Sequence, residues 1–137
     1  MGRRQSRESA MQVLYQVDVG KMAVDEALRN IQENFVLAES DFEFASQLVY
    51  GTLEKMEELD KTIAGYSREW QLERMAAVDR NILRLAMYEM LYVDDIPHGV
   101  SINEAVELAK RFGGKDSGKF INGILGAFAR RVGETRA

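Results

Sequence analysis

The sequence predicts an all-α fold, a compact domain of six or seven helices. Apolar residues recur at helical spacing along nearly the whole chain, and Pro97 is the only proline. No stretch shows the alternation of apolar and polar residues that marks a half-buried strand. With 137 residues, 46% of them apolar and 29% charged, the chain has the size and composition of one globular domain over residues 1–137.

Amphipathic stripes predict the first two helices. Apolar residues spaced three and four apart favour a helix over about 6–18, which Gly20 ends. The same spacing favours a second helix over about 24–35.

A longer helix follows. Ser40 and Glu43 have the spacing of a capping box, and they predict a helix that runs to about residue 57. Gly51 inside this helix costs about 1 kcal/mol relative to alanine, so we expect a neighbouring helix to approach it closely. A shorter helix is predicted over 59–65.

Residues 76–93 differ from the other segments because their apolar side chains point in nearly every direction. Arg80, Asn81 and Arg84 form only a narrow polar strip. A helix that is apolar almost all round is buried, so we expect this one to be the central column of the fold, ended by Pro97.

Two more helices complete the chain. Ser101 and Glu104 form a second capping box, which predicts a helix that ends at Gly113. Either Asp116 or Ser117 then caps a last helix. The apolar stripe of that helix consists of Ile121, Ile124, Leu125, Phe128 and Val132.

Missing residue types exclude several kinds of chemistry. The chain has no cysteine, which excludes disulfides, thiolate zinc sites, iron–sulfur clusters and thiol catalysis. His98 is the only histidine, which excludes hydrolytic triads and histidine-rich metal sites. No apolar run suits a membrane span or a signal peptide. We therefore expect a cytoplasmic protein that is not an enzyme and uses no metal or cofactor.

Residues 113–119 match the spacing G-x-x-x-x-G-K of a phosphate-binding loop, but two features argue against nucleotide hydrolysis. The next residue should be a serine or threonine that holds a magnesium ion, and here it is Phe120. Such a loop also follows a strand, whereas a predicted helix precedes this one. We therefore reject this function.

The net charge of −4 conceals an uneven distribution. Residues 25–60 carry two basic and ten acidic groups, whereas residues 110–131 carry six basic groups and one acidic group. The N-terminal segment adds Arg3, Arg4 and Arg7, and positive charge at a helix N-terminus is unfavourable unless an anion binds. If the two ends of the chain meet in the fold, these groups form one positive patch.

Both basic segments are candidate RNA-binding sites. Lys115 and Lys119 flank a glycine turn and a helix N-terminus, where backbone N–H groups bind phosphates. Phe120 lies off the apolar stripe; it either stacks on an unpaired base or packs on a neighbouring helix. The N-terminal arginines either contact successive phosphates or belong to a frayed, solvated terminus.

Three motifs together resemble the NusB family of bacterial transcription antitermination factors over nearly the full chain. Residues 3–15 are similar to the family's arginine-rich first helix, R-R-x-x-R-E-x-A-x-Q-x-L-Y. Residues 78–89 resemble its central helix. The third motif joins Ile-Pro at 96–97 to I-N-E-A-V-E-L-A-K at 102–110, and then to F-G, D-S, K-F and N-G within 112–123. This combination is long and specific.

The resemblance implies an all-helical fold of two roughly perpendicular bundles, and binding of a short single-stranded RNA element, boxA, in nascent ribosomal RNA transcripts. It also implies a protein partner, NusE, which is a small-subunit ribosomal protein, and joint action with RNA polymerase and other Nus factors. The family pattern places Arg3, Arg4, Arg7, Asp116, Lys119 and Phe120 on the RNA-facing surface, beside Lys115. It places Tyr15, Glu73 and Asp79 where the family meets NusE.

The sequence also departs from the family pattern and leaves alternatives open. Gln5 and Ser6 stand where members often carry more basic residues, and His98-Gly99 stands where Tyr-Lys is common, which puts RNA affinity in doubt. The module also resembles the N-terminal domain of ribosomal RNA cytosine methyltransferases, which need a glycine-rich cofactor loop and a cysteine. A third interpretation is a module whose acidic stretch binds a basic protein without RNA. Whether the chain forms a homodimer stays open.

Overall fold

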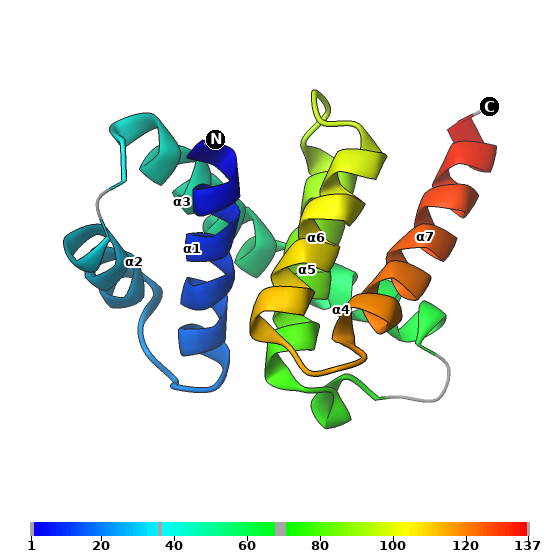
Figure 1. Ribbon diagram of the computed structural model, residues 1–137, viewed down its shortest axis with the longest axis horizontal. Helices are drawn as coiled ribbons and strands as arrows, with labels where there is room; N and C mark the ends of the chain where they lie inside the picture. Colours follow the sequence, from blue (N-terminus) through cyan, green and yellow to red (C-terminus); the bar gives the residue numbers. More distant parts are fainter. Residues whose placement is uncertain (1, 36, 68–70, 137) are drawn as a thin grey trace.

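Helices account for nearly all of the computed structural model, which describes residues 2–35, 37–67 and 71–136 (Figure 1). In chain order they are α1 (Gly2–Asp18), α2 (Val24–Asn34), α3 (Glu39–Glu54), α4 (Met56–Tyr66), the short 3-10 helix η1 (Leu72–Arg74), α5 (Ala77–Tyr92), α6 (His98–Phe112) and α7 (Ser117–Arg136). No strand occurs in these segments, which confirms the all-α prediction. None of their helices is both long enough and apolar enough to cross a membrane.

The helices form two groups that meet at α5. Figure 1 shows α1, α2 and α3 on one side and α4, α6 and α7 on the other, with α5 behind α6. Helix α1 packs on α2, α3 and α5, and α5 in turn contacts α3, α4, α6 and α7. The central position predicted for residues 76–93 is therefore confirmed.

The hydrophobic core is built around α5 because this helix has apolar side chains on most of its sides. Ile82, Leu83 and Met87 are completely buried. Leu14 from α1 and Leu125 from α7 are buried in the same cluster. Burial of these apolar side chains is the main favourable contribution to folding, and it fixes the positions of the helices that surround α5.

The polar strip of α5 is largely buried as well, and ion pairs satisfy it. Arg84 Nε lies 2.7 Å from Asp60 Oδ1 on α4, and Arg84 Nη1 lies 3.1 Å from Asp18 Oδ2 at the end of α1. Arg80 Nε and Asn81 Nδ2 donate to the same Asp18 oxygen at 2.8 and 3.0 Å. Burial raises the pKa of Asp18, but these hydrogen bonds outweigh that effect and hold the pKa below its ordinary value. The network joins α1, α4 and α5.

Gly51 of α3 confirms the predicted close approach of a neighbouring helix. A Cβ atom built on Gly51 would overlap the ring of Tyr88 from α5. The ring occupies the space that any larger residue at this position would need. Packing between α3 and α5 therefore offsets the unfavourable effect of glycine inside a helix.

Both predicted capping boxes are wrong. The N-cap residue of α3 is Ala38 and that of α6 is Pro97, and neither makes a side-chain cap hydrogen bond in the described structure. Ser40 therefore lies inside the first turn of α3. Ser101 lies inside α6, and its Oγ donates a hydrogen bond to Glu89 Oε1 on α5 at 2.8 Å. The Ser101 hydroxyl, which the local sequence assigns to a helix cap, therefore joins α6 to α5 instead.

Candidate nucleic-acid interface

The N-terminal arginines lie in the first two turns of α1, which begins at Gly2, ahead of its predicted start. Arg7 is the buried one, with a side chain that is 7% exposed. Its Nε and Nη2 donate hydrogen bonds of 2.9 and 2.7 Å to the two carboxylate oxygens of Glu89 on α5. This is the geometry of an ion pair that holds two helices together, and the predicted contact between Arg7 and RNA stays a prediction.

Arg3 and Arg4 are the exposed arginines. Arg4 Nε donates to Glu104 Oε1 at 3.1 Å, and Arg4 Nη2 donates to Glu104 Oε2 at 2.6 Å. The hydrogen bond from Arg4 holds the pKa of Glu104 below its usual value, and the same contact raises the pKa of Arg4. Arg3 places its guanidinium 4.3 Å from the centre of the Phe44 ring and 3.9 Å from Asp95 Oδ2.

The second basic segment is the loop after α6 together with the first turn of α7. Lys115, Asp116 and Lys119 are all exposed there. The backbone N–H of Gly114 donates to Ser117 Oγ at 2.9 Å, which holds the turn in front of α7. The two lysines therefore lie beside a helix N-terminus, the arrangement that binds phosphates. A helix, α6, precedes this glycine turn, unlike the strand that a phosphate-binding loop follows.

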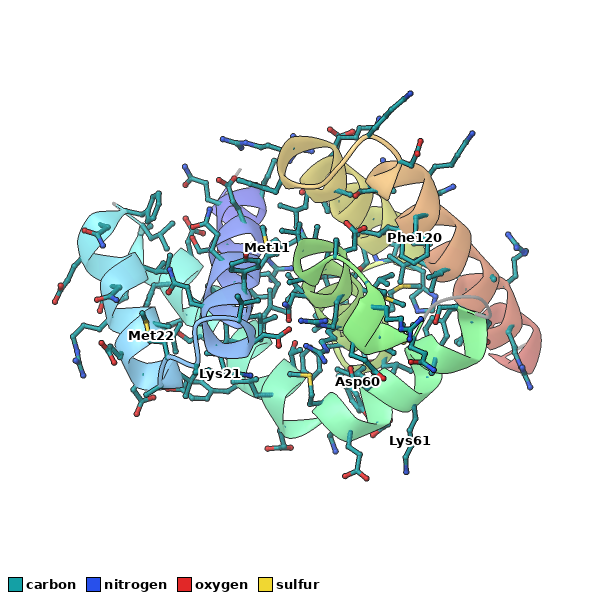
Figure 2. The ribbon with its side chains drawn as sticks, turned by 90° about the horizontal axis from the view of Figure 1, so that it is seen from below. Met11, Lys21, Met22, Asp60, Lys61 and Phe120 are labelled. Carbon is teal, nitrogen blue, oxygen red and sulfur yellow. The ribbon has the colours of Figure 1, made fainter. Side chains whose placement is uncertain are left out.

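Phe120 packs on neighbouring helices, which was one of the two roles predicted for it. It also lines a cavity. The side chain is half-buried and packs against the core. In Figure 2 it lies among the side chains beside α7, whereas Lys61 extends outward. It lines a cavity of about 400 Å³ together with Met75, Asp79 and Ser117. Stacking of a base on this ring stays a prediction.

The two basic segments meet only in part: Lys110 and Arg111 line one groove with Arg4 and Arg7, but three carboxylates lie among them, and Lys115 and Lys119 do not line the groove. Helices α1 and α6 run side by side: Arg4 contacts Glu104 in the middle of α6, and Arg111 Nη1 lies 2.9 Å from Glu8 Oε2 near its end. Figure 1 shows the N-terminus at the top and the α6–α7 loop at the bottom. The physical reason is the helix between them: Glu104 and Gly113 are nine residues apart, which is about 14 Å along α6.

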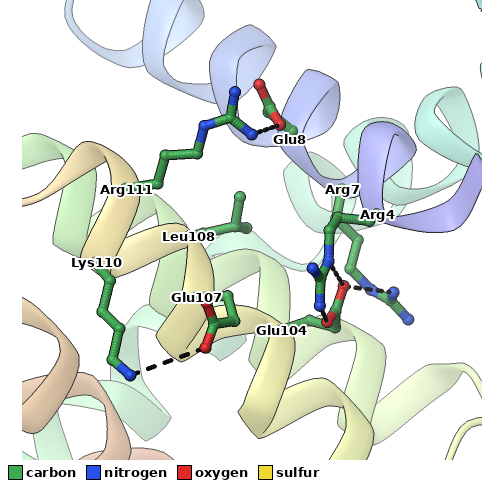
Figure 3. A pocket seen from close by; sticks show the side chains of 8 residues that line it. All are labelled: Arg4, Arg7, Glu8, Glu104, Glu107, Leu108, Lys110 and Arg111. Carbon is green, nitrogen blue, oxygen red and sulfur yellow. Dashed lines mark hydrogen bonds and ion pairs between the residues drawn. The ribbon is translucent and has the colours of Figure 1, made fainter. Parts of the chain in front are cut away.

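A groove of about 230 Å³ lies between α1 and α6 (Figure 3). It is lined by Arg4, Arg7, Glu8, Glu104, Glu107, Leu108, Lys110 and Arg111. Figure 3 shows Leu108 between the Arg111–Glu8 pair and the Arg4–Glu104 pair. Three carboxylates therefore lie along the path between the basic segments, each of them close to a cation.

None of these carboxylates was predicted to lie in the RNA site, and Glu104 was assigned to a helix cap, although helical spacing contains a signal for them. Glu104, Glu107 and Arg111 are three and four residues apart, so they lie on one face of α6. A face of mixed charge that packs beside another charged helix is typical of ion-paired grooves. What sequence cannot supply is the pairing of α6 with α1, which brings Glu8 to Arg111.

The residues expected to face a protein partner lie on α1, η1 and α5. Tyr15 is 37% exposed on α1, and Glu73 is exposed in η1. Asp79 lies in the first turn of α5 and is only 9% exposed. Its Oδ1 atom is buried without a hydrogen-bond partner among the described residues. Asp79 and Phe120 line the same cavity, so the candidate partner site adjoins the candidate RNA site.

Comparison with known sequences identifies the relatives of this chain. The model of the NusB family matches residues 4–130. The chain is 60% identical over 126 residues to the transcription antitermination protein NusB of Desulforamulus reducens, which covers 92% of this chain and 88% of that protein. It is 52% identical over 136 residues to the protein of the same name from Pelotomaculum thermopropionicum, covering 99% and 94%.

Solved structures agree with the sequence relatives. NusB from T. maritima matches this fold with a TM-score of 0.88 at 38% identity, over 93% of this chain and 90% of that one. A chain in the crystal structure of antitermination factors NusB and NusE in complex with dsRNA matches with a TM-score of 0.86 at 27% identity, over 95% and 97%. The family model, the sequence relatives and the fold agree over most of the length: the chain belongs to the NusB family.

Proposed function

We propose that this protein is a transcription antitermination factor that binds boxA-type single-stranded RNA in nascent ribosomal RNA transcripts together with NusE. It acts in the cytoplasm as an adaptor without catalysis, and helps RNA polymerase, with other Nus factors, to resist premature termination. The observation that carries the proposal is the match, over 95% of this chain, to a chain in a structure of NusB and NusE in complex with dsRNA. Relatives at 60% and 52% identity bear the name transcription antitermination protein NusB.

For RNA, we assign two contact areas, one at the exposed N-terminal arginines and one at the turn between α6 and α7. Arg4 supplies a cation at one end, and Arg3, which is also exposed, lies beside it in α1. Lys115 and Lys119 supply cations at the other end, beside the N-terminus of α7, and bind phosphates there. Next to them, Phe120 stacks on an unpaired base, and the exposed carboxylate of Asp116 accepts hydrogen bonds from base N–H groups.

For NusE, the proposal assigns Tyr15, Glu73 and Asp79. The shared cavity gives a physical reason for joint binding, because Asp79 and Phe120 line it together. A partner that contacts Asp79 therefore lies within reach of RNA that is held at Phe120. The two ligands can then bury surface against each other as well as against this protein, which makes their binding cooperative.

The acidic surface supports a second candidate function, a module that binds a basic protein and no RNA. The range 25–60 includes nearly all of α2, all of α3 and the first five residues of α4, and it carries ten acidic groups against two basic ones. Exposed aromatic side chains lie among these carboxylates: Tyr50 donates a hydrogen bond to Asp25, and Tyr92 Oη donates to Glu58 Oε1 at 2.6 Å. A surface of this charge attracts basic proteins and repels RNA.

Fluorescence anisotropy of labelled boxA RNA, titrated with the protein at several salt concentrations with and without NusE, separates the two candidates. The antitermination proposal predicts binding that NusE strengthens, that weakens steeply as salt rises, and that exceeds binding to a scrambled RNA. NusE binding without any RNA binding, with or without the partner, would instead support the protein-interaction module and overturn the RNA assignment.

A further inference from the structure

Glu104 lies between Arg4 and Arg7 in the groove between α1 and α6 (Figure 3). Its two oxygens accept hydrogen bonds of 3.1 and 2.6 Å from Arg4, and its Oε1 lies 3.6 Å from Arg7 Nη1. The Glu104 side chain is 15% exposed, whereas that of Arg4 is 62% exposed. Two parallel bonds from one arginine to a carboxylate have the geometry that an arginine also makes with a phosphate group.

The charges in this part of the groove are balanced in the free protein. Glu89 binds Arg7, and Glu104 binds Arg4, so two cations face two anions. The bonds to Glu104 use Nε and Nη2 of Arg4, the edge that would otherwise hold a phosphate with two bonds. A phosphate that takes this edge must first displace the carboxylate.

The other carboxylates of the groove are placed differently. Glu107 is 54% exposed, and its contact is with Lys110 of its own helix at 3.8 Å. Glu8 binds Arg111 at the far end of the groove. Glu104 is the carboxylate whose two oxygens both engage an exposed N-terminal arginine among the described residues.

We propose that Glu104 sets the RNA affinity of this protein by competing with RNA phosphates for the guanidinium of Arg4. This inference rests on the proposed function, because it concerns the same RNA. Phosphate contacts carry no sequence information, so the competition weakens binding to boxA and to unrelated RNA by the same factor. It keeps the N-terminal arginines from holding unrelated RNA, and leaves the choice of RNA to the contacts at the other end of α6 and to the partner.

Glu104→Gln tests the proposal, because it removes the charge and keeps the shape of the side chain. We expect the variant to bind boxA RNA and scrambled RNA about two- to fivefold more tightly, as released surface ion pairs do, with a steeper salt dependence. Glu57→Gln on α4 is the matched control. It makes the same change in net charge at a side chain that is 88% exposed and paired with Lys61 of its own helix. Equal tightening by both variants would assign the effect to net charge and overturn the proposal.

A double-mutant cycle with Arg4→Ala shows whether the competition acts through Arg4. The gain from Glu104→Gln is expected to vanish in the Arg4→Ala background, because the group in competition is then absent. A gain of the same size in both backgrounds would mean that Glu104 repels RNA directly, and it would overturn the proposal.

Two further measurements keep the outcome clear. Glu104→Asp retains the charge and retracts the carboxylate by one methylene, and we expect it to tighten RNA binding less than Glu104→Gln does. If Glu104→Gln does not fold, unchanged or weaker binding by Glu104→Asp overturns the proposal. If the unaltered protein binds RNA with NusE and neither variant tightens it, this inference alone is wrong. If the unaltered protein binds no RNA under either condition, the proposed function is wrong as well.

Discussion

The guanidinium of Arg7 and the carboxylate of Glu89 form a two-pronged ion pair inside the protein, with side chains that are 7% and 1% exposed. Ser101 Oγ donates a further hydrogen bond to the same carboxylate at 2.8 Å, so α1, α5 and α6 meet at Glu89. Loss of one partner of such a pair leaves the other as a buried, unpaired charge. Three arginines that look alike in sequence therefore divide into one that holds helices together and two that are exposed.

Arg7→Ala is expected to lower the free energy of unfolding by about 3–5 kcal/mol, because it strands the buried carboxylate of Glu89. Urea unfolding followed by circular dichroism measures the change. Arg4→Ala is the control, and it should leave unfolding nearly unchanged because the Arg4 side chain is mostly exposed. An Arg7→Ala protein of unaltered stability and reduced RNA affinity would contradict this account and make Arg7 an RNA contact.

Lys119→Ala is expected to weaken boxA binding at low salt and to make its salt dependence shallower by about 0.7 in the slope of log K against log salt. The physical reason is the loss of one phosphate contact and of the counterions that it releases. Lys61→Ala on α4 provides the comparison, since Lys61 is exposed and pairs only with Glu57 among the described residues. Equal slopes for the two variants would place Lys119 outside the RNA site.

Phe120→Leu is expected to reduce RNA binding by about 1–3 kcal/mol, because leucine fills much of the space but offers no ring on which a base can stack. Phe128→Leu removes a ring that is only 5% exposed in the core. It should lower stability and leave RNA affinity intact. RNA affinity and thermal unfolding are measured for both variants. If Phe120→Leu binds RNA as tightly as the natural protein, the Phe120 ring serves only in packing.

Gly51→Ala is expected to destabilise the protein by about 1–3 kcal/mol, since the new Cβ overlaps the ring of Tyr88 and forces α3 away from α5. Gly65→Ala in α4 has the opposite expectation. No described neighbouring atom lies within 4 Å of a Cβ built there, so the better helix propensity of alanine should raise stability by up to about 1 kcal/mol. Melting temperatures that move in the same direction for both variants would show that the contact with Tyr88 does not decide the effect.

Asp18 predicts a loss of stability in acid. Burial raises its pKa, but the hydrogen bonds from Arg80 and Asn81 outweigh burial, so the pKa in the folded protein lies below the ordinary value of 3.8. A lowered pKa means that the carboxylate contributes stability that is fully present above pH 3.8 and is lost as the pH falls through the folded pKa. Asp18→Asn should therefore be less stable than the natural protein near neutral pH.

Urea unfolding of both proteins from about pH 6 to about pH 2.5 tests this prediction. The difference in the free energy of unfolding should shrink toward the acidic end, as the pH falls through the lowered pKa of Asp18. A difference that stays constant over the whole range would mean that the charge of Asp18 contributes nothing to stability.

The helices and the central position of α5 could be predicted because apolar spacing records which side of each helix is buried. In residues 76–93, apolar side chains occupy nearly every side of the helix. This pattern is a local property of the sequence, and it corresponds directly to the burial of α5 in the structure. The close approach at Gly51 was predictable for a similar reason, since glycine inside a helix needs a compensating contact. The cap predicted at Ser101 is wrong because its hydroxyl bonds to a distant residue, Glu89, rather than to its own helix.

The site could be predicted only as a set of charged residues, and its arrangement could not. Whether Arg7 is exposed depends on Glu89, which lies 82 residues away in the chain. The ion pair between Arg4 and Glu104 depends on the packing of α1 beside α6, which no local pattern of the sequence encodes. For the same reason, the sequence could not show that Arg4 lies beside the middle of α6, whereas Lys115 and Lys119 follow its end.

In the proposed complex, one RNA strand contacts both basic segments, at Arg4 and at Lys119. The most direct measurement is the salt dependence of boxA binding, in the presence of NusE, for Arg4→Ala, Lys119→Ala and the double variant. Each single variant is expected to have a shallower slope than the natural protein, and the double variant to lose the sum of the two effects, because distant contacts are additive. A double variant no weaker than one of the single variants would show that RNA contacts only one end, and would contradict the claim.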